Sequence, residues 1–493
     1  MSMLYSPNVI FVTGNRMATE STRRHFLKLS AIGLAATATA EMPAVLEDGA
    51  SPAKPSGKIE VWVTDQKVRC AQVEAISWRP ASGQPSTSAI LLSPNKKFQT
   101  ILGFGAAFTD AACYMFNQLL PTAREQLFHE MFHPSEMGLN VCRTCMGSSD
   151  YSTKVYSYDE GDSDPELKRF SIDHDREYIL PMLRLARSMN PELFLFSSPW
   201  SPPGWMKSGG SMLGGSMRRG YLSNYAEYFV KFLQAYAAEG VPVQAVTPQN
   251  EVDTDQDGRM PACIWPQEYE IEFVRQLGPL LQQNGFSTKV WILDHNYNLW
   301  GRAICELDDP GLRQYCKAVA WHGYAGEAGM MSKVHDAHPG VEMHWTEGGP
   351  DYTSPSYLTD WAQWGRTFTE VLRNWCESLT GWNLALDEMG RPNIGPFPCG
   401  GVVTIHSQTK EITRSGQYWA FAQFSRFIPR GAKRFDSQST LENVDHVGVE
   451  NPDGQRALVL TNSAADRTVT LQMDGMQAEF NLTKDSVTTL VWA

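Results

Sequence analysis

The sequence lacks several features that would each assign it to a different class of protein. Its formal net charge is −12 and it has no long basic run, so nucleic acid is not an expected partner. Its nine cysteines show no paired spacing of the zinc-site kind. The C-x-x-C from Cys142 to Cys145 falls within a predicted strand, where the two Cα atoms lie about 10 Å apart, beyond disulfide reach. We interpret it as structural rather than redox-active.

The motifs for cofactors and metals are also incomplete. Residues 103–108 (GFGAAF) begin like a dinucleotide-binding loop, but the third glycine of that motif is missing. Residues 253–258 imitate the start of a calcium loop, yet the twelfth position is Ile264 where a glutamate is required. The pair His335-x-x-His338 stands beside a proline, as in a surface turn. We therefore expect no metal and no cofactor.

The first 40 residues have the parts of a bacterial twin-arginine export signal, in the usual order. These parts are Arg23-Arg24, the weakly apolar run 29–38 and an A-x-A cleavage site that ends at Ala40. Met1 or Met17 is the start. The apolar run is too short to span a bilayer and no other segment could do so, which predicts an exported protein, periplasmic or secreted, without a transmembrane segment.

Short strands bounded by turn residues are predicted near both ends of the chain. They cover residues 59–64, 89–92, 457–461, 468–473, 478–482 and 486–492. The residues between the first two strands are interpreted as a polar loop, and residues 41–57 as a linker. Because neither end has enough strands for a sandwich, we expect residues 58–98 and 426–493 to form one antiparallel β-sandwich together.

Between these ends, strand-like and helix-like segments alternate. Eight strand candidates cover residues 101–106, 139–146, 193–198, 243–248, 288–293, 318–323, 341–346 and 380–386. Amphipathic stretches separate them, among them 121–132, 175–188, 223–239 and 266–283. Eight such units predict an α/β fold of the (β/α)₈ (TIM) barrel type over residues 99–425.

Two strand ends carry candidate catalytic residues. An apolar run rich in β-branched residues stops at Pro248, which cannot donate to a sheet, and Asn250 and Glu251 follow. A second strand ends at Glu347, followed by two glycines that leave room for a substrate. A single loop glutamate is usually only solvated, but the carboxyl ends of barrel strands hold the catalytic residues of this fold. Two carboxylates there are what glycoside hydrolysis requires.

At this point the chain resembles glycoside hydrolase family 30, in particular its glucosylceramidase-like branch. The matching stretches, in family order, are 103–110 (GFGAAFTD), 198–207 (SPWSPPGWMK), 246–251 (VTPQNE), 346–348 (TEG), 382–386 (WNLAL) and 424–429 (FSRFIP). Two features depart from the glucosylceramidase pattern. Gly381 stands where that pattern has an acidic residue, and the loop 253–264 is this chain's own.

The resemblance implies a retaining β-glycosidase with Glu251 as acid/base and Glu347 as nucleophile. It also implies supporting roles for six further residues: Asn250 for the sugar 2-hydroxyl, Asp150, Trp200 and Trp382 for the sugar pocket, Tyr324 near the nucleophile, and Arg143 in support of its carboxylate. Plain polar packing is an alternative for the last two. We further expect ionised Glu347 to raise the pKa of Glu251.

The implied substrates are carbohydrates or glycolipids, first of all terminal β-glucosides such as glucosylceramide-like lipids or glucan fragments. A β-1,6-glucanase or a xylan- or fucose-directed relative is an alternative within the class. A non-catalytic glycan-binding protein is the alternative from another class. The sequence leaves the oligomeric state open.

Overall fold

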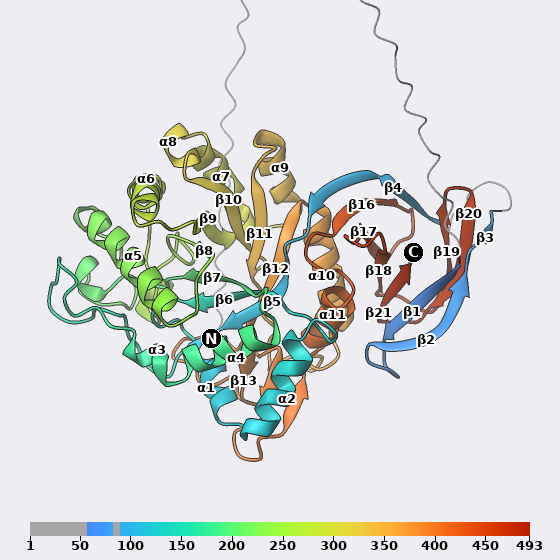
Figure 1. The fold of residues 1–493 in the computed structure, drawn as a ribbon, viewed down its shortest axis with the longest axis horizontal. Coiled ribbons are helices and arrows are strands. Elements are labelled where there is room, and N and C mark those ends of the chain that lie inside the picture. Colours follow the sequence, from blue (N-terminus) through green and yellow to red (C-terminus); the bar gives the residue numbers. More distant parts are fainter. Residues whose placement is uncertain (1–56, 82–88) are drawn as a thin grey trace, which may run out of the picture. The chain divides into compact units, whose positions relative to one another are not determined.

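The computed structural model describes residues 57–81 and 89–493 (Figure 1). The predicted export signal and the linker up to residue 56 lie outside the described residues. Among the helices that are described, none is long and apolar enough to span a membrane.

Eight parallel strands close into a barrel, with the last strand paired to the first (Figure 1). In order, they are β5 (Gly103–Phe108), β6 (Val141–Cys145), β7 (Phe194–Ser198), β8 (Ala245–Val246), β9 (Lys289–Asn296), β10 (Cys316–His322), β11 (Glu342–Glu347) and β12 (Cys376–Asn383). Each overlaps one of the eight predicted strand segments. The predicted (β/α)₈ barrel is confirmed.

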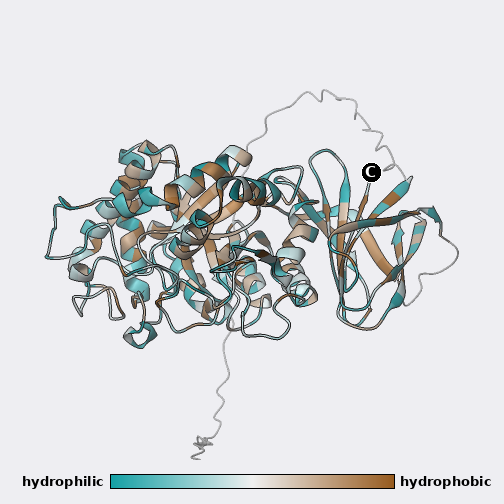
Figure 2. Ribbon diagram, turned by 90° about the horizontal axis from the view of Figure 1, so that it is seen from below, coloured by the Kyte–Doolittle hydropathy of each residue, from teal (hydrophilic) through white to brown (hydrophobic). Residues whose placement is uncertain are grey.

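The barrel strands are buried on both sides, which explains their nearly continuous apolar sequences (Figure 2). Every residue of β5 is buried. A Cβ at Gly105 would lie 1.9 Å from the carbonyl oxygen of Val141, so the first two strands approach as closely as they do because this residue is glycine. One layer of the barrel interior is filled by Val141, Phe196, Ala245, Trp291, Ala318 and Ala320.

Helices follow the strands, as the amphipathic stretches predict. The helices are α1 (Asp110–Asn117), α2 (Pro121–Phe132), α3 (Asp173–Glu177), α4 (Ile179–Met189), α5 (Leu222–Ala238), α6 (Gln267–Gln283), α7 (Trp300–Leu307), α8 (Pro310–Arg313), α9 (Gly329–Ala337), α10 (Trp361–Arg373) and α11 (Gly416–Ser425). The predicted helix over 175–188 is divided between α3 and α4. At Tyr178, between them, the backbone leaves helical geometry.

Strands from both parts of the chain that flank the barrel form a ten-stranded sheet, in the order β2-β1-β21-β18-β17-β16-β4-β19-β20-β3. These strands are β1 (Lys58–Thr64), β2 (Ala71–Ser77), β3 (Arg79–Pro80), β4 (Ala89–Thr100), β16 (Lys433–Gln438), β17 (Val444–Glu450), β18 (Arg456–Asn462), β19 (Arg467–Met473), β20 (Met476–Leu482) and β21 (Ser486–Trp492). A second hydrophobic core, with Ile59, Leu458 and Leu490, lies within it. The predicted fold class, a barrel with an accompanying β-sandwich, is confirmed.

The prediction of a polar loop between the first two predicted strands is partly wrong, because β2 forms there. This strand lies at the edge of the sheet and most of its side chains are exposed, so it lacks the apolar alternation of a half-buried strand. A small sheet of β13 (Ala385–Leu386), β14 (Val403–Ile405) and β15 (Ile412–Arg414) was not predicted either.

The chain passes between the sandwich and the barrel through two segments that lie side by side. β4 ends at Thr100 and β5 begins at Gly103, and the return passage follows α11. The amide of Ile101 donates to the carbonyl of Ala432 at 2.7 Å, and the amide of Gly431 donates to the carbonyl of Ile101 at 2.9 Å. The two passages are therefore bonded to each other.

Candidate active site

A cavity of about 500 Å³ opens at the carboxyl ends of the barrel strands. Seven of the eight predicted site residues line it: Asp150, Trp200, Asn250, Glu251, Tyr324, Glu347 and Trp382. The eighth, Arg143 of β6, is fully buried and bonds two of the others. The structure thus brings together every residue that the resemblance selected.

The two glutamates reach the cavity from different elements. Glu347 is the last residue of β11. Glu251 follows β8 by five residues, and its amide donates to the carbonyl of Asp294 at 3.0 Å. Its φ of +53° lies in the left-handed region, which is uncommon for a residue other than glycine. Neighbouring strands therefore hold the backbone of Glu251 in a conformation that its sequence does not favour.

Arg143 connects three residues of this site through its guanidinium. Its Nη1 donates to Glu347 Oε2 at 2.6 Å, and its Nη2 donates to Asn250 Oδ1 and to Asp294 Oδ2, each at 2.7 Å. A planar guanidinium can serve three acceptors at fixed angles, which an ammonium group cannot. Arg143 therefore fixes the orientation of Glu347 and Asn250 together.

Asp294 is a central residue of the site that the sequence analysis missed. Its carboxylate accepts hydrogen bonds from the hydroxyls of Ser198 and Thr247 at 2.7 Å and from that of Thr346 at 2.6 Å. Burial acts to raise the pKa of Asp294, but Arg143, His322 and Thr346 together outweigh burial and hold that pKa well below its usual range. Asp294 is thus a permanent buried negative charge.

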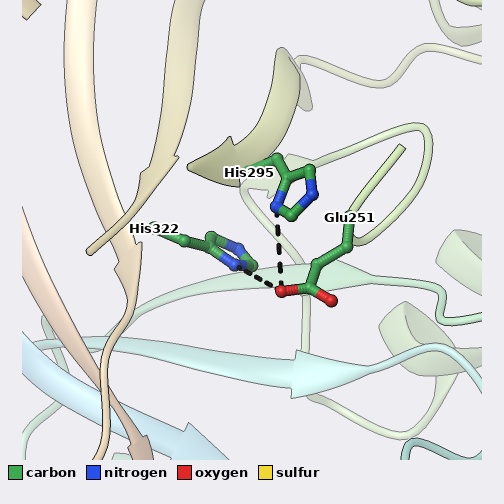
Figure 3. A group of neighbouring side chains, drawn as sticks. All are labelled: Glu251, His295 and His322. Carbon is green, nitrogen blue, oxygen red and sulfur yellow. Dashed lines mark ion pairs between the residues drawn. The ribbon is translucent and has the colours of Figure 1, made fainter. Parts of the chain in front are cut away.

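Two histidines lie against one oxygen of Glu251 (Figure 3). The Nδ1 atom of His322 is 3.4 Å from Glu251 Oε1, and that of His295 is 3.7 Å from the same oxygen. Gln256 donates to the other oxygen, Oε2, at 2.9 Å. Burial acts to raise the pKa of Glu251, but the hydrogen bond of His322 and the charge of His295 outweigh it and lower the pKa.

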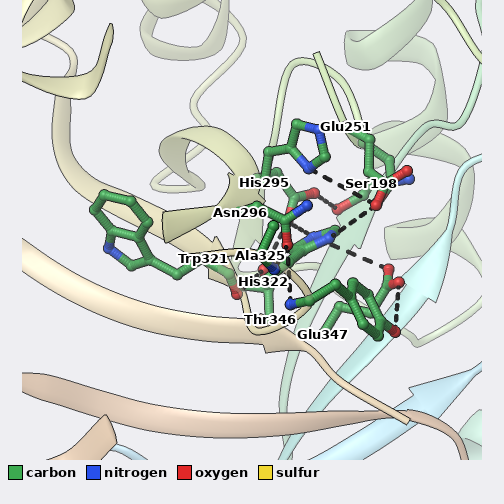
Figure 4. A network of polar contacts seen from close by, with 12 residues as sticks. Ser198, Glu251, His295, Asn296, Trp321, His322, Ala325, Thr346 and Glu347 are labelled. Atoms are coloured by element: carbon green, nitrogen blue, oxygen red, sulfur yellow. Dashed lines mark hydrogen bonds and ion pairs between the residues drawn. The ribbon is translucent and has the colours of Figure 1, made fainter. Parts of the chain in front are cut away.

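His322 lies between the two glutamates (Figure 4). Its Nδ1 faces Glu251, and its Nε2 lies 3.9 Å from Glu347 Oε2 and 3.1 Å from Asp294 Oδ1. Burial acts to lower the pKa of His322, but Glu347, Asp294 and Glu251 together raise it to about 9. The expectation that ionised Glu347 gives Glu251 a raised pKa is therefore wrong for the free site, where the pKa of Glu251 is lowered. The proton lies on the neighbouring imidazole instead.

Glu347 accepts hydrogen bonds at both of its oxygens. Arg143 donates to Oε2, and the hydroxyl of Tyr324 donates to Oε1 at 3.1 Å. Burial raises the pKa of Glu347, although the charges of His322 and Arg143 oppose this rise. The backbone of Tyr324 is held by Asn296, whose Oδ1 accepts from its amide at 2.9 Å.

The cavity wall combines aromatic faces with an unpaired acid. Trp200 and Trp382 stack with ring centroids 4.9 Å apart, and the guanidinium of Arg143 lies 4.5 Å from the Trp200 ring. Asp150 is buried, and its Oδ1 has no hydrogen-bond partner among the described residues. Burial, and then the charge of Glu347, raise the pKa of Asp150 well above its usual range. This arrangement suits a sugar ring, which offers an apolar face and hydroxyl donors.

The missed residues follow strand ends that the sequence analysis had recognised. Asp294 and His295 come directly after the predicted strand 288–293, and His322 lies two residues before Tyr324. The same rule that selected Glu251 and Glu347, polar residues at the end of a buried strand, would have found them.

Two family models match the chain. The glycosyl hydrolase family 30 TIM-barrel domain matches residues 101–428, and the family 30 beta sandwich domain matches residues 431–490. Barrel, paired carboxyls and aromatic wall together define a glycoside hydrolase. More particularly, the chain belongs to glycosyl hydrolase family 30.

Relatives in the family are named for different activities. An endo-1,6-beta-D-glucanase of Neurospora crassa is 34% identical over 391 residues, covering 75% of this chain and 80% of the relative. Putative glucosylceramidase 4 of Caenorhabditis elegans is 30% identical over 432 residues, covering 83% of this chain and 82% of the relative. Among solved structures, the endo-beta1,6-glucanase BT3312 matches with a TM-score of 0.80 and 28% identity, over 89% of this chain and all of that one.

Proposed function

We propose that this family 30 hydrolase is an exported, retaining β-glucosidase that cleaves β-glucosidic bonds by double displacement. The observation that carries the proposal is the position of one imidazole, His322, between Glu251 at 3.4 Å and Glu347 at 3.9 Å. Two carboxyls that contact the same imidazole can act on one glycosidic bond, as the acid/base and the nucleophile of a retaining enzyme do.

In the first step, a carboxylate oxygen of Glu347 attacks the anomeric carbon, and the bond to the leaving oxygen breaks. Glu251 gives a proton to that oxygen, with His322 as its exchange partner. In the second step, Glu251 takes a proton from water, and the water oxygen displaces Glu347. Arg143 and Tyr324 donate to Glu347 and so stabilise the charged form that attacks and later departs.

The remaining predicted residues orient the sugar. Because Asn250 Oδ1 accepts from Arg143, its amide nitrogen is free to face the 2-hydroxyl of the bound sugar. The unpaired oxygen of Asp150 is an acceptor for another hydroxyl. The stacked pair of Trp200 and Trp382 offers an apolar wall for the sugar ring. These contacts support a saccharide unit held directly above the two glutamates.

Two substrate groups are consistent with this site, and both present a β-linked glucosyl unit. The 34% identity to a fungal endo-1,6-beta-D-glucanase favours β-1,6-linked glucan fragments. The 30% identity to putative glucosylceramidases of Caenorhabditis elegans supports glucosylceramide-like lipids as the second candidate. Gly381, at the position where the glucosylceramidase pattern has an acidic residue, favours the glucan.

Proton NMR of the first-formed sugar tests the mechanism. With an aryl β-glucoside, we expect the β-anomer to appear before mutarotation, whereas an α-anomer formed first would contradict the double displacement. A second assay compares β-1,6-gluco-oligosaccharides, glucosylceramide in detergent, and aryl β-xylosides and β-galactosides. Saccharide binding without hydrolysis of any of these would show a glycan-binding protein instead. The Glu347→Gln variant controls for a contaminating hydrolase.

A further inference from the structure

Glu251, His295 and His322 point three ligand atoms at one small volume (Figure 3). These atoms all lie within 4.8 Å of one another, and Glu251 Oε1 is 3.4 Å and 3.7 Å from the two imidazole Nδ1 atoms. Around a tetrahedral Zn²⁺ with ligand bonds near 2.0–2.1 Å, neighbouring donor atoms lie about 3.3 Å apart. The two spacings from the Glu251 oxygen are close to that value.

Both Nδ1 atoms are buried and make no hydrogen bond of good geometry within the described residues, because their contacts with Glu251 Oε1 are 3.4 Å and 3.7 Å long. The side chains of His322 and His295 are exposed by only 0% and 7%. A buried polar atom without a partner is costly, and two of them aimed at the same carboxylate oxygen need an explanation. A cation bound between the three groups would satisfy all of them.

The opposite nitrogen of each imidazole is held by a carboxylate. His322 Nε2 lies 3.1 Å from Asp294 Oδ1, and His295 Nε2 lies 2.6 Å from Asp253 Oδ1. A carboxylate that accepts from one ring nitrogen orients the ring, and it is the usual outer partner of a zinc-bound histidine. The incoming ion must displace the second proton of His322, after which the lone pair of Nδ1 is available. Both histidines are therefore arranged as metal ligands.

The charges around the group also favour a dication. Ion pairs connect seven side chains within this group and around it: Glu251, Asp253, Asp294, His295, His322, Glu347 and Arg143. Four of these seven are carboxylates and one is a guanidinium. Because Glu251 and His295 line the cavity, a fourth coordination position would open toward it.

We propose that Glu251, His295 and His322 form a site for a divalent transition-metal ion of the Zn²⁺ class, and that the bound ion inhibits hydrolysis. The ion takes the Glu251 oxygen that otherwise exchanges a proton with His322, so the acid/base is lost while the ion stays bound. The inhibition rests on the proposed function, whereas the binding does not.

A second group of possible metal ligands lacks the unpaired ring nitrogens of the first group. Glu342, His344 and Glu377 also have ligand atoms within 4.8 Å of one another. However, Lys289 already donates to both oxygens of Glu342, and both ring nitrogens of His344 have partners. An ion pair and two hydrogen bonds account for that group without a metal.

Isothermal titration of the full chain with Zn²⁺ alone tests the binding. We expect one ion per chain, a loss of at least about 100-fold in affinity for His295→Ala, and a loss of about 10–100-fold for Asp253→Asn, which removes only the outer partner. The matched control is Asp257→Asn, the same change in charge on the same loop. Its carboxylate is 86% exposed and bonds no imidazole, so it should bind as the wild type does.

Substitution by Co²⁺ adds a spectroscopic readout, since a tetrahedral site of nitrogen and oxygen ligands gives a visible absorption band. Thermal unfolding of each variant confirms that it folds. A wild type that binds no Zn²⁺ at millimolar concentration, or a His295→Ala variant that binds with unchanged affinity, would overturn the site.

Hydrolysis of an aryl β-glucoside with and without Zn²⁺ tests the inhibition. We expect reversible loss of activity that a chelator restores, with Asp253→Asn requiring about 10–100-fold more Zn²⁺ for the same loss. Normal turnover with the site fully loaded would overturn the inhibitory role. If the metal binds as expected and the chain hydrolyses no glycoside at all, the proposed function fails and the site stands.

Discussion

Arg143 and Asp294 form an ion pair of 2.7 Å in which neither side chain is exposed to solvent. Such a pair contributes little net stability, because burial of two charges offsets most of their attraction. Its value lies in orientation, since the same guanidinium also bonds Glu347 and Asn250. Removing one partner, however, leaves the other charge buried and uncompensated.

The substitution Arg143→Lys should therefore damage both activity and stability. An ammonium group keeps the charge but cannot bond three separate acceptors in a fixed plane. We expect kcat/KM to fall by about 100-fold or more, and the free energy of unfolding to fall by about 3–5 kcal/mol if the ammonium leaves Asp294 unpaired. Steady-state kinetics and urea unfolding measure the two effects. Activity within threefold of the wild type would show that orientation by the guanidinium is unimportant.

Tyr324→Phe removes the hydroxyl that donates to Glu347 Oε1 at 3.1 Å. Because the side chain is 48% exposed, the fold should remain intact. A hydrogen bond to a charged group contributes about 1.5–3 kcal/mol, so kcat should fall by roughly 10–100-fold. Tyr114→Phe, on α1 and away from the cavity, is the matched control. Equal kinetics for the two variants would assign Tyr324 to polar packing.

Glu377→Gln should stabilise the protein only at higher pH. Burial and the charge of Glu342 raise the pKa of Glu377 to about 7. Between the unfolded pKa of about 4.3 and this value, the folded state holds a proton that the unfolded state has lost, so stability falls as the pH rises. We expect the melting temperature of the variant to exceed that of the wild type at about pH 8 and to match it at about pH 4. An increase of the same size at both pH values would contradict this account.

The first 40 residues lie outside the described structure, and we predict that export removes them. The twin arginines and the A-x-A site place the cleavage after Ala40. Intact-mass measurement of protein from its native host should find Glu41 as the first residue. Replacing Arg23 and Arg24 by lysine should leave the precursor uncleaved in the cytoplasm. Full-length protein outside the cytoplasm would contradict the prediction.

The barrel and the two candidate catalytic glutamates could be predicted from the sequence because each signal is local, whereas the other six site residues were selected by the family resemblance. A buried strand followed by a polar residue is visible within ten residues, as at Glu251 and Glu347. The protonation of the site could not be predicted, because it depends on contacts among three strands. His322 of β10 acts on Glu251 after β8, and Asp294 of β9 acts on His322. Edge strand β2 was not predicted, because little of it is buried and its sequence therefore lacks the apolar pattern of a strand.

Strand β1 pairs with β21, for example Glu60 with Val491, so partners in this sheet are separated by nearly the whole described chain. During synthesis, β1 and β4 are made first. Their pairing with β16, β19 and β21 can form only after those strands have been synthesised. Unpaired edges invite association with other chains, so the nascent protein is most prone to aggregation until its last strand is made. A chaperone that shields these early strands should improve the yield of folded protein more than any change within the barrel.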